Sequence, residues 1–203
     1  MIEQLKTKLG PKCTAICVNR RLPGTFYQPT RPFKFCEAVN YSFREPVKLV
    51  DENLGCPGAR RSLGFDNDDV ALARIISENN KIPVPFIENA LGKISKSTKI
   101  DTVFLGMSKI MEQKIQPDLY IVYLLPGMVT KIIHVLAKNE IQPFVSSFSL
   151  LSVCGNVFSS CYQNNRVSLS FGCPESRKSG GIAPNEVVMG FPFEIAQTIV
   201  NAV

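Results

Sequence analysis

The 203-residue chain is long enough to bury a hydrophobic core without disulfide bonds. Its composition, 45% hydrophobic and 20% charged, is typical of a globular protein and excludes a disordered or low-complexity chain. Seven cysteines accompany a single histidine and no tryptophan, so chemistry that needs two or more histidines is excluded. Thiol chemistry and thiolate–metal chemistry remain open.

The charge pattern and the apolar runs restrict the partners and the compartment. The formal net charge of +6 comes from 23 basic residues dispersed along the chain, with no basic run that carries interleaved aromatic residues. We therefore expect no nucleic-acid partner. The first six residues lack the apolar core of a signal peptide and the apolar runs are too short to span a bilayer, so we expect a cytoplasmic protein that does not enter a membrane. In a reducing compartment cysteines serve as metal ligands, reactive thiols or buried apolar side chains rather than in disulfides.

Short apolar runs alternate with amphipathic stretches along the whole chain. In chain order they predict strands at 14–18 and 46–50, helices at 68–79 and 86–94, and strands at 101–106 and 119–125. A turn at Pro126 and Gly127, a helix at 128–138, strands at 144–151, 166–171 and 186–190, and a terminal helix at 193–203 follow. This mixture predicts an α/β or α+β fold, which we expect to form one domain over residues 1–203.

An internal repeat adds information about the organisation of this domain. Residues 55–64, GCPGARRSLG, match residues 172–181, GCPESRKSGG, with Gly, Cys, Pro, Arg, Ser and Gly in register. Cys56 and Cys173 are 117 residues apart, and Cys36 and Cys154 are 118 residues apart. We therefore predict a duplication with two halves, about 1–100 and 101–203, related by a pseudo-twofold axis.

The repeated cysteines predict a metal site. If the two halves pack about that axis, Cys36, Cys56, Cys154 and Cys173 converge from four loops onto one point between them. Ligation by cysteine alone suits a [4Fe–4S] cluster or a tetrahedral zinc ion. Structural zinc sites usually use closely spaced cysteine pairs, which are missing among these four cysteines, so the spacing favours the cluster and leaves zinc, or no metal, as alternatives.

The residues around Cys56 and Cys173 suit a thiolate. In each Gly-Cys-Pro segment the proline restricts the backbone of the cysteine and places its thiol at the start of a helix. Backbone N–H groups there, together with Arg60 and Arg177, would favour a thiolate or an anionic cluster, and the two arginines could instead hold an anionic substrate. We assign Cys13 and Cys17 to the core and leave Cys161 unassigned.

Three functions from different classes remain in competition. The first is an iron–sulfur protein that carries out redox, sulfur or small-molecule chemistry at the cluster, with a redox partner or a small anionic molecule as its partner. The second is a metal-free thiol enzyme or anion-binding module that uses Cys56 and Cys173 beside Arg60 and Arg177. The third is an interaction protein whose cysteines are all structural. Whether the chain is an enzyme, and its oligomeric state, stay open.

The segments that carry these cysteines also resemble a known family. The chain is similar to the DUF169, or ArCR, family of uncharacterised archaeal and bacterial proteins at residues 36–39, 56–60 and 168–173, at Arg177 and at residues 186–192. The resemblance implies a single cytoplasmic domain from a prokaryotic, anaerobic source. It implies no reaction, and fold membership would not settle the function in any case.

Overall fold

A seven-stranded sheet forms the centre of the computed structural model, which describes residues 2–98, 100–145 and 150–202. The strand order is β2-β3-β1-β4-β7-β6-β5, and only the β5–β6 pair is parallel. The strands are β1 Cys13–Val18, β2 Val47–Leu49, β3 Val103–Leu105, β4 Leu119–Leu124, β5 Phe144–Val145, β6 Ser168–Ser170 and β7 Val187–Pro192. Strands and helices are mixed along the chain, as the sequence predicts.

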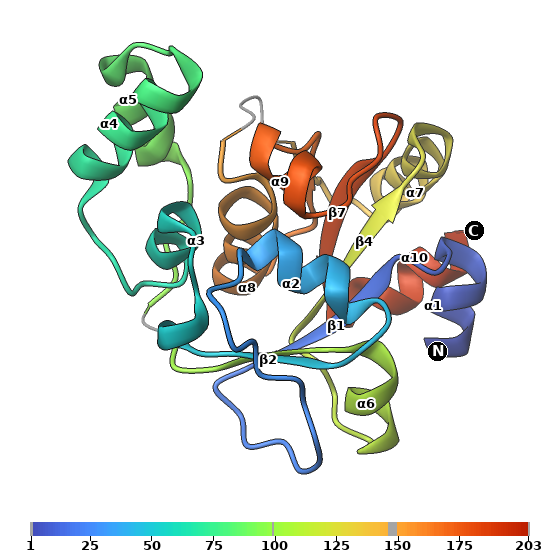
Figure 1. Ribbon diagram of the computed structural model, residues 1–203. Coiled ribbons are helices and arrows are strands. Elements are labelled where there is room, and N and C mark those ends of the chain that lie inside the picture. The colour runs from blue at the N-terminus through green and yellow to red at the C-terminus, as the bar shows by residue number, and fades with distance from the viewer. Residues whose placement is uncertain (1, 99, 146–149, 203) are drawn as a thin grey trace.

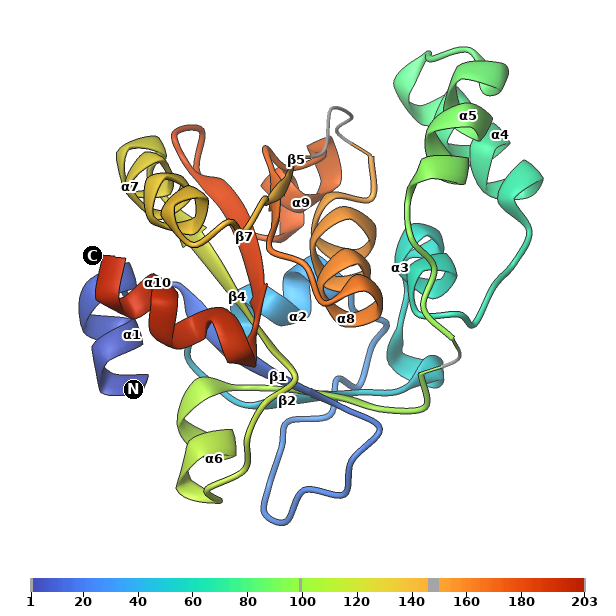
Figure 2. The same ribbon diagram turned by 180° about the vertical axis from the view of Figure 1, so that it is seen from behind.

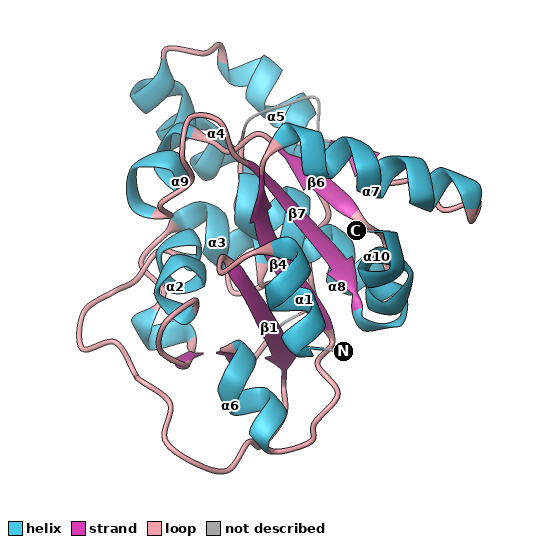
Figure 3. Ribbon diagram, turned by 90° about the vertical axis from the view of Figure 1, so that its right-hand side faces the viewer, coloured by secondary structure: helices cyan, strands magenta, loops and turns pink. Residues whose placement is uncertain are grey.

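Helices cover both faces of the sheet (Figures 1 and 3). One face carries α2 Phe35–Ser42, α3 Pro57–Ser62, the π-helix η2 Ser152–Ser159, α8 Ser160–Asn164 and α9 Pro174–Ser179. The hairpin of α4 Asp69–Asn80 and α5 Val84–Lys93 extends from this side, away from the sheet (Figure 1). The other face carries α1 Ile2–Leu9, α6 Met107–Glu112, α7 Pro126–Lys138 and α10 Ala196–Ala202, and the two chain ends lie near each other there (Figure 2). None of the helices described is both long and apolar enough to cross a bilayer.

The two layers of helices explain why the central strands are apolar throughout. Successive side chains of a strand point to opposite faces of the sheet. In β1, Ile16 and Val18 join the core under α2 and α3, whereas Cys13, Ala15 and Cys17 join the core under α1 and α6. Every residue of β1, β4 and β7 is buried, so these strands read as continuous apolar runs rather than alternating ones.

Read outward from the central β1–β4 pair, the strand order is the same in both directions. On one side β1 is followed by β3 and then β2; on the other side β4 is followed by β7 and then β6. At the outer edge of each group there is one parallel contact. Tyr27 forms a parallel bridge to β2 in the first group, and β5 pairs in parallel with β6 in the second. Because β3 belongs to the first group, that group extends past residue 100. A duplication would produce this arrangement, but topology alone does not establish one, and the duplication stays a prediction.

Several predicted elements differ from those observed. The turn predicted at Pro126 and Gly127 is wrong, because both residues open α7, where a proline at the first position needs no N–H partner. Of the strand predicted at 144–151, only β5 is observed; residues 146–149 lie outside the described part of the chain, and Leu150 and Leu151 precede η2. The terminal helix begins with a short 3₁₀ turn, Phe193–Ile195. Another such turn, η1, covers Asp51–Asn53.

Candidate functional site

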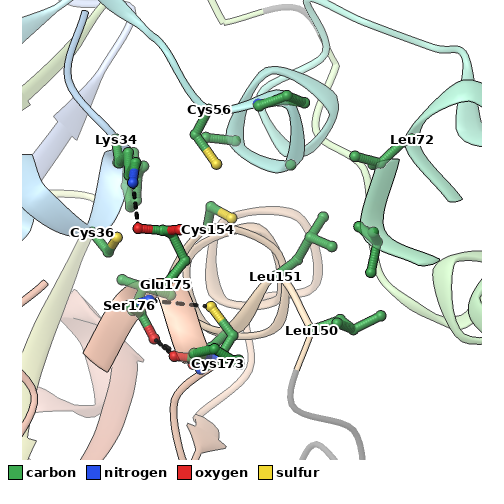
Figure 4. Close-up of a pocket in the computed structure, with 18 of the residues that line it drawn as sticks. Lys34, Cys36, Cys56, Leu72, Leu150, Leu151, Cys154, Cys173, Glu175 and Ser176 are labelled. Carbon is green, nitrogen blue, oxygen red and sulfur yellow. Dashed lines mark hydrogen bonds and ion pairs between the residues drawn. The ribbon is translucent and has the colours of Figure 1, made fainter. Parts of the chain in front are cut away.

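The structure brings the four predicted cysteines to one cavity. Cys36, Cys56, Cys154 and Cys173 all line a cavity of about 220 Å³ between α2, α3, α4, η2 and α9. Their sulfur atoms surround the same space in Figure 4. The cavity lies on the sheet face that carries α2, and residues from both groups of strands and helices contribute to it. The four residues thus meet at one cavity, but Cys36 and Cys154 come from helices and not from loops as predicted, and the role of the four as ligands of one group stays a prediction.

Cys56 and Cys173 occupy equivalent places at the start of a short helix. Each is the N-cap residue, Cys56 of α3 and Cys173 of α9, and each is followed by a proline at the first helical position. Both cysteines have extended backbone conformations, as the following proline requires. The Cys173 sulfur accepts a hydrogen bond of 3.4 Å from the Ser176 backbone N–H. The predicted position of both thiols at the start of a helix is confirmed.

Cys36 and Cys154 lie within helices, and close packing brings them to the same cavity. Cys36 is in the first turn of α2, and Cys154 is in η2, a π-helix whose residues are all buried. A Cβ atom at Gly180 would lie 2.9 Å from Cys36 Cβ, and one at Gly155 would lie 2.6 Å from Ile94. Both glycines therefore permit close approaches that a larger residue would block. π-Helices are rare, and the single-turn form that interrupts α-helices is frequently found at functional sites.

Burial favours the protonated form of three of the thiols that line the cavity. Burial raises the pKa of Cys36, Cys56 and Cys154 above the usual value for a thiol. Negative charge on Cys56 or Cys173 raises the pKa of both Cys36 and Cys154 further. Cys36 has the same effect on Cys154, and Cys173 has it on Cys56. The backbone N–H groups of Ala59 and Gly58 lower the pKa of Cys56 and so oppose the effect of burial. The four thiols thus form one electrostatically coupled group.

An ion pair joins the two halves of the site beside the thiols. Lys34, two residues before Cys36, pairs with Glu175, two residues after Cys173, and both side chains line the cavity. Ser179 Oγ lies 3.3 Å from Lys34 Nζ and donates to Glu175 Oε1 at 2.9 Å. The hydrogen bond from Lys34 lowers the pKa of Glu175, and the same bond raises the pKa of Lys34. Negative charge on Cys36 or Cys56 raises the pKa of Lys34 further, so this ammonium group lies within electrostatic range of both sulfurs.

The two predicted arginines are engaged elsewhere. Neither Arg60 nor Arg177 is among the residues that line the cavity. Arg60 pairs with Asp51, and Arg177 donates to the backbone carbonyls of Phe171, Ala183 and Glu186. These bonds fix the loops around α3 and α9, and the predicted role in holding an anion draws no support from them.

The remaining cysteines do not line the cavity. Cys13 and Cys17 lie in the core on the opposite face of the sheet, as predicted. Cys161 is buried in α8, close to Gly190 of β7. His134 is exposed on α7.

Sequence reasoning missed the charged pair and the apolar wall of the site. Lys34 and Glu175 stand close to the cysteines in the sequence, and Glu175 replaces the Gly58 of the other repeat. This difference between the two repeats was the sequence feature that could have drawn attention to Glu175. The wall formed by Leu72, Ile75 and Ile76 of α4 had none, because its residues follow the ordinary pattern of an amphipathic helix.

Within the described residues, no three His, Cys, Asp or Glu side chains are close enough together to hold one metal ion. A mononuclear zinc site requires every sulfur within about 2.3 Å of the same atom. The cysteines instead surround the cavity, and each could bind a different atom of a larger group.

The comparisons with known proteins identify the family to which the chain belongs. The family described as "Uncharacterised ArCR" (DUF169) matches residues 3–202. The uncharacterized protein MJ0308 of Methanocaldococcus jannaschii is 30% identical over 181 residues, which is 84% of this chain and 76% of that protein. No solved structure matches the chain. The match of nearly the whole chain shows that this protein belongs to the DUF169 (ArCR) family.

Proposed function

We propose that the protein binds a [4Fe–4S] cluster through Cys36, Cys56, Cys154 and Cys173. The observation that carries the proposal is the convergence of these four cysteines, from four separate elements, on one cavity. Three other cysteines were available to the fold and lie outside it. Selection of the four repeated cysteines is what a shared ligand would require.

The arrangement fits a cluster better than a single zinc ion. Each iron of a cubane cluster takes one thiolate, so the four sulfurs lie farther apart than they do around one ion. The described side chains offer no group that could hold a single ion, whereas the sulfurs do surround a common space (Figure 4). A zinc ion would require the sulfurs to move closer together.

The surroundings suit an anionic group. N–H groups directed at cluster sulfurs and burial of the site are two means by which proteins tune a cluster. The Ser176 amide already donates to Cys173, and the ammonium group of Lys34, although paired with Glu175, lies within electrostatic range of Cys36 and Cys56. Four thiolate ligands would support electron transfer to a redox partner, whereas three would leave one iron open to a substrate.

The metal-free thiol enzyme draws less support. Such an enzyme needs a thiolate of low pKa, yet burial raises the pKa of Cys56. The sequence predicts that Arg60 and Arg177 stabilise the thiolate or hold a small anionic molecule. In the structure both arginines are bound to other groups. Lys34, paired with Glu175, is the cation that does line the cavity.

Reconstitution with iron and sulfide under argon tests the proposal. We expect wild-type protein and the Cys13→Ala/Cys17→Ala variant to take up iron and sulfide equally. The Cys56→Ala/Cys173→Ala variant, which also lacks two thiols, should take up neither. Equal uptake by the two double variants would contradict the ligand assignment. Uptake of zinc with no uptake of iron would contradict the choice of metal.

A further inference from the structure

The cavity has a second wall that contributes no sulfur. Leu72, Ile75 and Ile76 of α4 line it, together with Leu150 and Leu151 (Figure 4). Their side chains present only hydrocarbon, which cannot bind iron. A cluster therefore accounts for the thiol side of the cavity and leaves this side without an assigned role.

One face of α4 forms this wall. The α4 residues that line the cavity are Leu72, Ile75, Ile76, Asn79 and Asn80, which recur at spacings of three and four residues. The face is apolar for its first two turns and carries two amides at its outer end. Ile75 is 43% exposed, so a large aliphatic side chain at the cavity remains in contact with water.

Hydrogen bonds and an ion pair from Arg61 fix the end of the wall where α4 begins. Arg61, whose side chain is 3% exposed, donates to Asp69 at the start of α4 and to the carbonyls of Leu91 and Ile94 at the end of α5. Beyond this anchor the hairpin extends away from the sheet in both views (Figures 1 and 2). The apolar face thus stands opposite the thiols as a separate element of the fold.

The charges of the cavity specify an uncharged ligand. Lys34 and Glu175 are the charged residues among those that line it, and they are paired with each other. A charged molecule would lose hydration against the aliphatic wall without gaining an opposite charge. Apolar pockets with a few polar groups bind mainly apolar molecules, and the amides of Asn79 and Asn80 suit a carbonyl or hydroxyl group at one end.

The volume limits the size of this ligand. The cavity measures about 220 Å³. A protein cavity of about 150 Å³ lined by apolar side chains is enough to hold benzene. A single substituted ring or a short chain is therefore the largest molecule that the iron-free cavity accommodates, and a bound cluster would leave less room.

We propose that the apolar face of α4 binds an uncharged, largely apolar small molecule, at most a substituted single ring, against the four thiols. The inference rests on the proposed function in one respect: it makes this molecule the substrate or effector of the cluster. Binding itself depends on the wall and not on iron.

Titration with small probes tests this site. We expect toluene and p-cresol to bind wild-type protein, and benzoate, the charged counterpart, not to bind, as measured by saturation-transfer NMR and calorimetry. Ile75→Lys should weaken binding of p-cresol at least about tenfold, because the lysine brings an unpaired charge to the wall. Val70→Lys is the matched control, since Val70 lies on the same helix, is 50% exposed and does not line the cavity.

The outcomes separate the ligand site from the cluster. Failure of both neutral probes to bind, tighter binding of benzoate, or equal effects of Ile75→Lys and Val70→Lys would overturn the inference; circular dichroism would verify that both variants fold. The same titrations on iron-free and reconstituted protein distinguish the two proposals. Protein that takes up no iron but binds p-cresol with the expected sensitivity to Ile75→Lys would contradict the cluster and support the ligand site.

Discussion

Two groups of cysteines lie on opposite faces of the same sheet. Cys13 and Cys17 are fully buried in β1, in the core shared with α1 and α6. Cys36, Cys56, Cys154 and Cys173 lie on the other face, at the starts of helices or within η2, around a cavity. The comparison teaches that the place of a cysteine in the fold, rather than its spacing in the sequence, separates a packing residue from a candidate ligand.

Judged by their spacing in the sequence alone, Cys13 and Cys17 would be the better candidates for metal ligands. Cys13 and Cys17, four residues apart, resemble a metal-binding pair more closely than any two of the four cavity cysteines do. In a strand, however, both side chains point into the same packed layer, where neighbouring apolar side chains surround them. At the start of a helix a side chain stands beside unpaired backbone N–H groups, which suits a thiolate.

The largest expected effect is a separation of iron binding from stability. Cys56→Ala or Cys173→Ala should abolish iron binding and cost the iron-free protein less than about 1 kcal/mol, because these side chains are only half-buried. Cys17→Ala should leave iron binding intact and cost about 1–2 kcal/mol through the cavity that it creates. Iron analysis and urea unfolding measure the two quantities. Loss of iron from Cys17→Ala would erase the distinction between the two groups.

The anchor of the hairpin provides the next largest effect. Arg61→Ala would leave the carbonyls of Leu91 and Ile94 without their donor, and we expect a loss of about 3–5 kcal/mol in the free energy of unfolding. Hydrogen exchange should rise across residues 69–93 more than in the sheet. Arg74→Ala, an exposed arginine of α4, is the control and should change stability by less than about 0.5 kcal/mol. Equal losses in the two variants would refute the anchor.

Alkaline pH should destabilise the protein through its core thiols. Burial, followed by the charge of Asp118, raises the pKa of Cys17 to about 11. The unfolded thiol has a pKa of about 8.5, so between these values the native state keeps a proton that the unfolded state has lost. The contribution of such a thiol to the free energy of unfolding is therefore fully present below about pH 8.5. Above that pH it decreases by about 1.4 kcal/mol per pH unit for each such thiol.

A variant isolates this contribution. Urea unfolding of iron-free Cys17→Ala between about pH 9 and pH 10.5 should show a slope smaller by about 1.4 kcal/mol per pH unit than that of the wild type. Ile16→Val, which removes a methyl group from the same strand and adds no titratable group, should keep the wild-type slope. Identical slopes for Cys17→Ala and the wild type would mean that the native thiol ionises freely.

The smallest effect concerns the ion pair beside the cavity. Lys34 and Glu175 are about one-third and one-half exposed, so Glu175→Gln should cost less than about 1 kcal/mol, and less at high salt. Iron binding should persist, since the pair provides charge and not a ligand. Glu112→Gln, in the pair with Lys109 on the other side of the sheet, is the control for a surface ion pair. Loss of iron from Glu175→Gln would show that the carboxylate belongs to the ligand set.

Much of the fold followed from periodicity, because long buried runs have few alternatives. The strands β1 and β4 and the helices α4 and α7 match the predicted segments closely. Short elements such as α3 and α9 carry too few residues to show a period, and their starts were indicated only by Cys-Pro. Nothing in the local sequence predicts the π-helix at Ser152–Ser159, in which Gly155 packs closely against Ile94 and Ser62.

The site was predictable in its thiols and not in its other groups. The repeat identified the four cysteines because a rare residue type recurred at offsets of 117 and 118 residues. Arg60 and Arg177 shared that recurrence, but their side chains bind loops of their own halves. The wall of α4 comes to the cavity through the anchor at Arg61, a tertiary contact that the sequence does not reveal.

The most direct test of the cluster is an absorption spectrum with iron and sulfide analysis of protein purified without oxygen. The account predicts a broad band at about 400 nm and about four irons and four sulfides per chain, the content of one [4Fe–4S] cluster. A colourless protein that holds no iron, even after reconstitution, would contradict it.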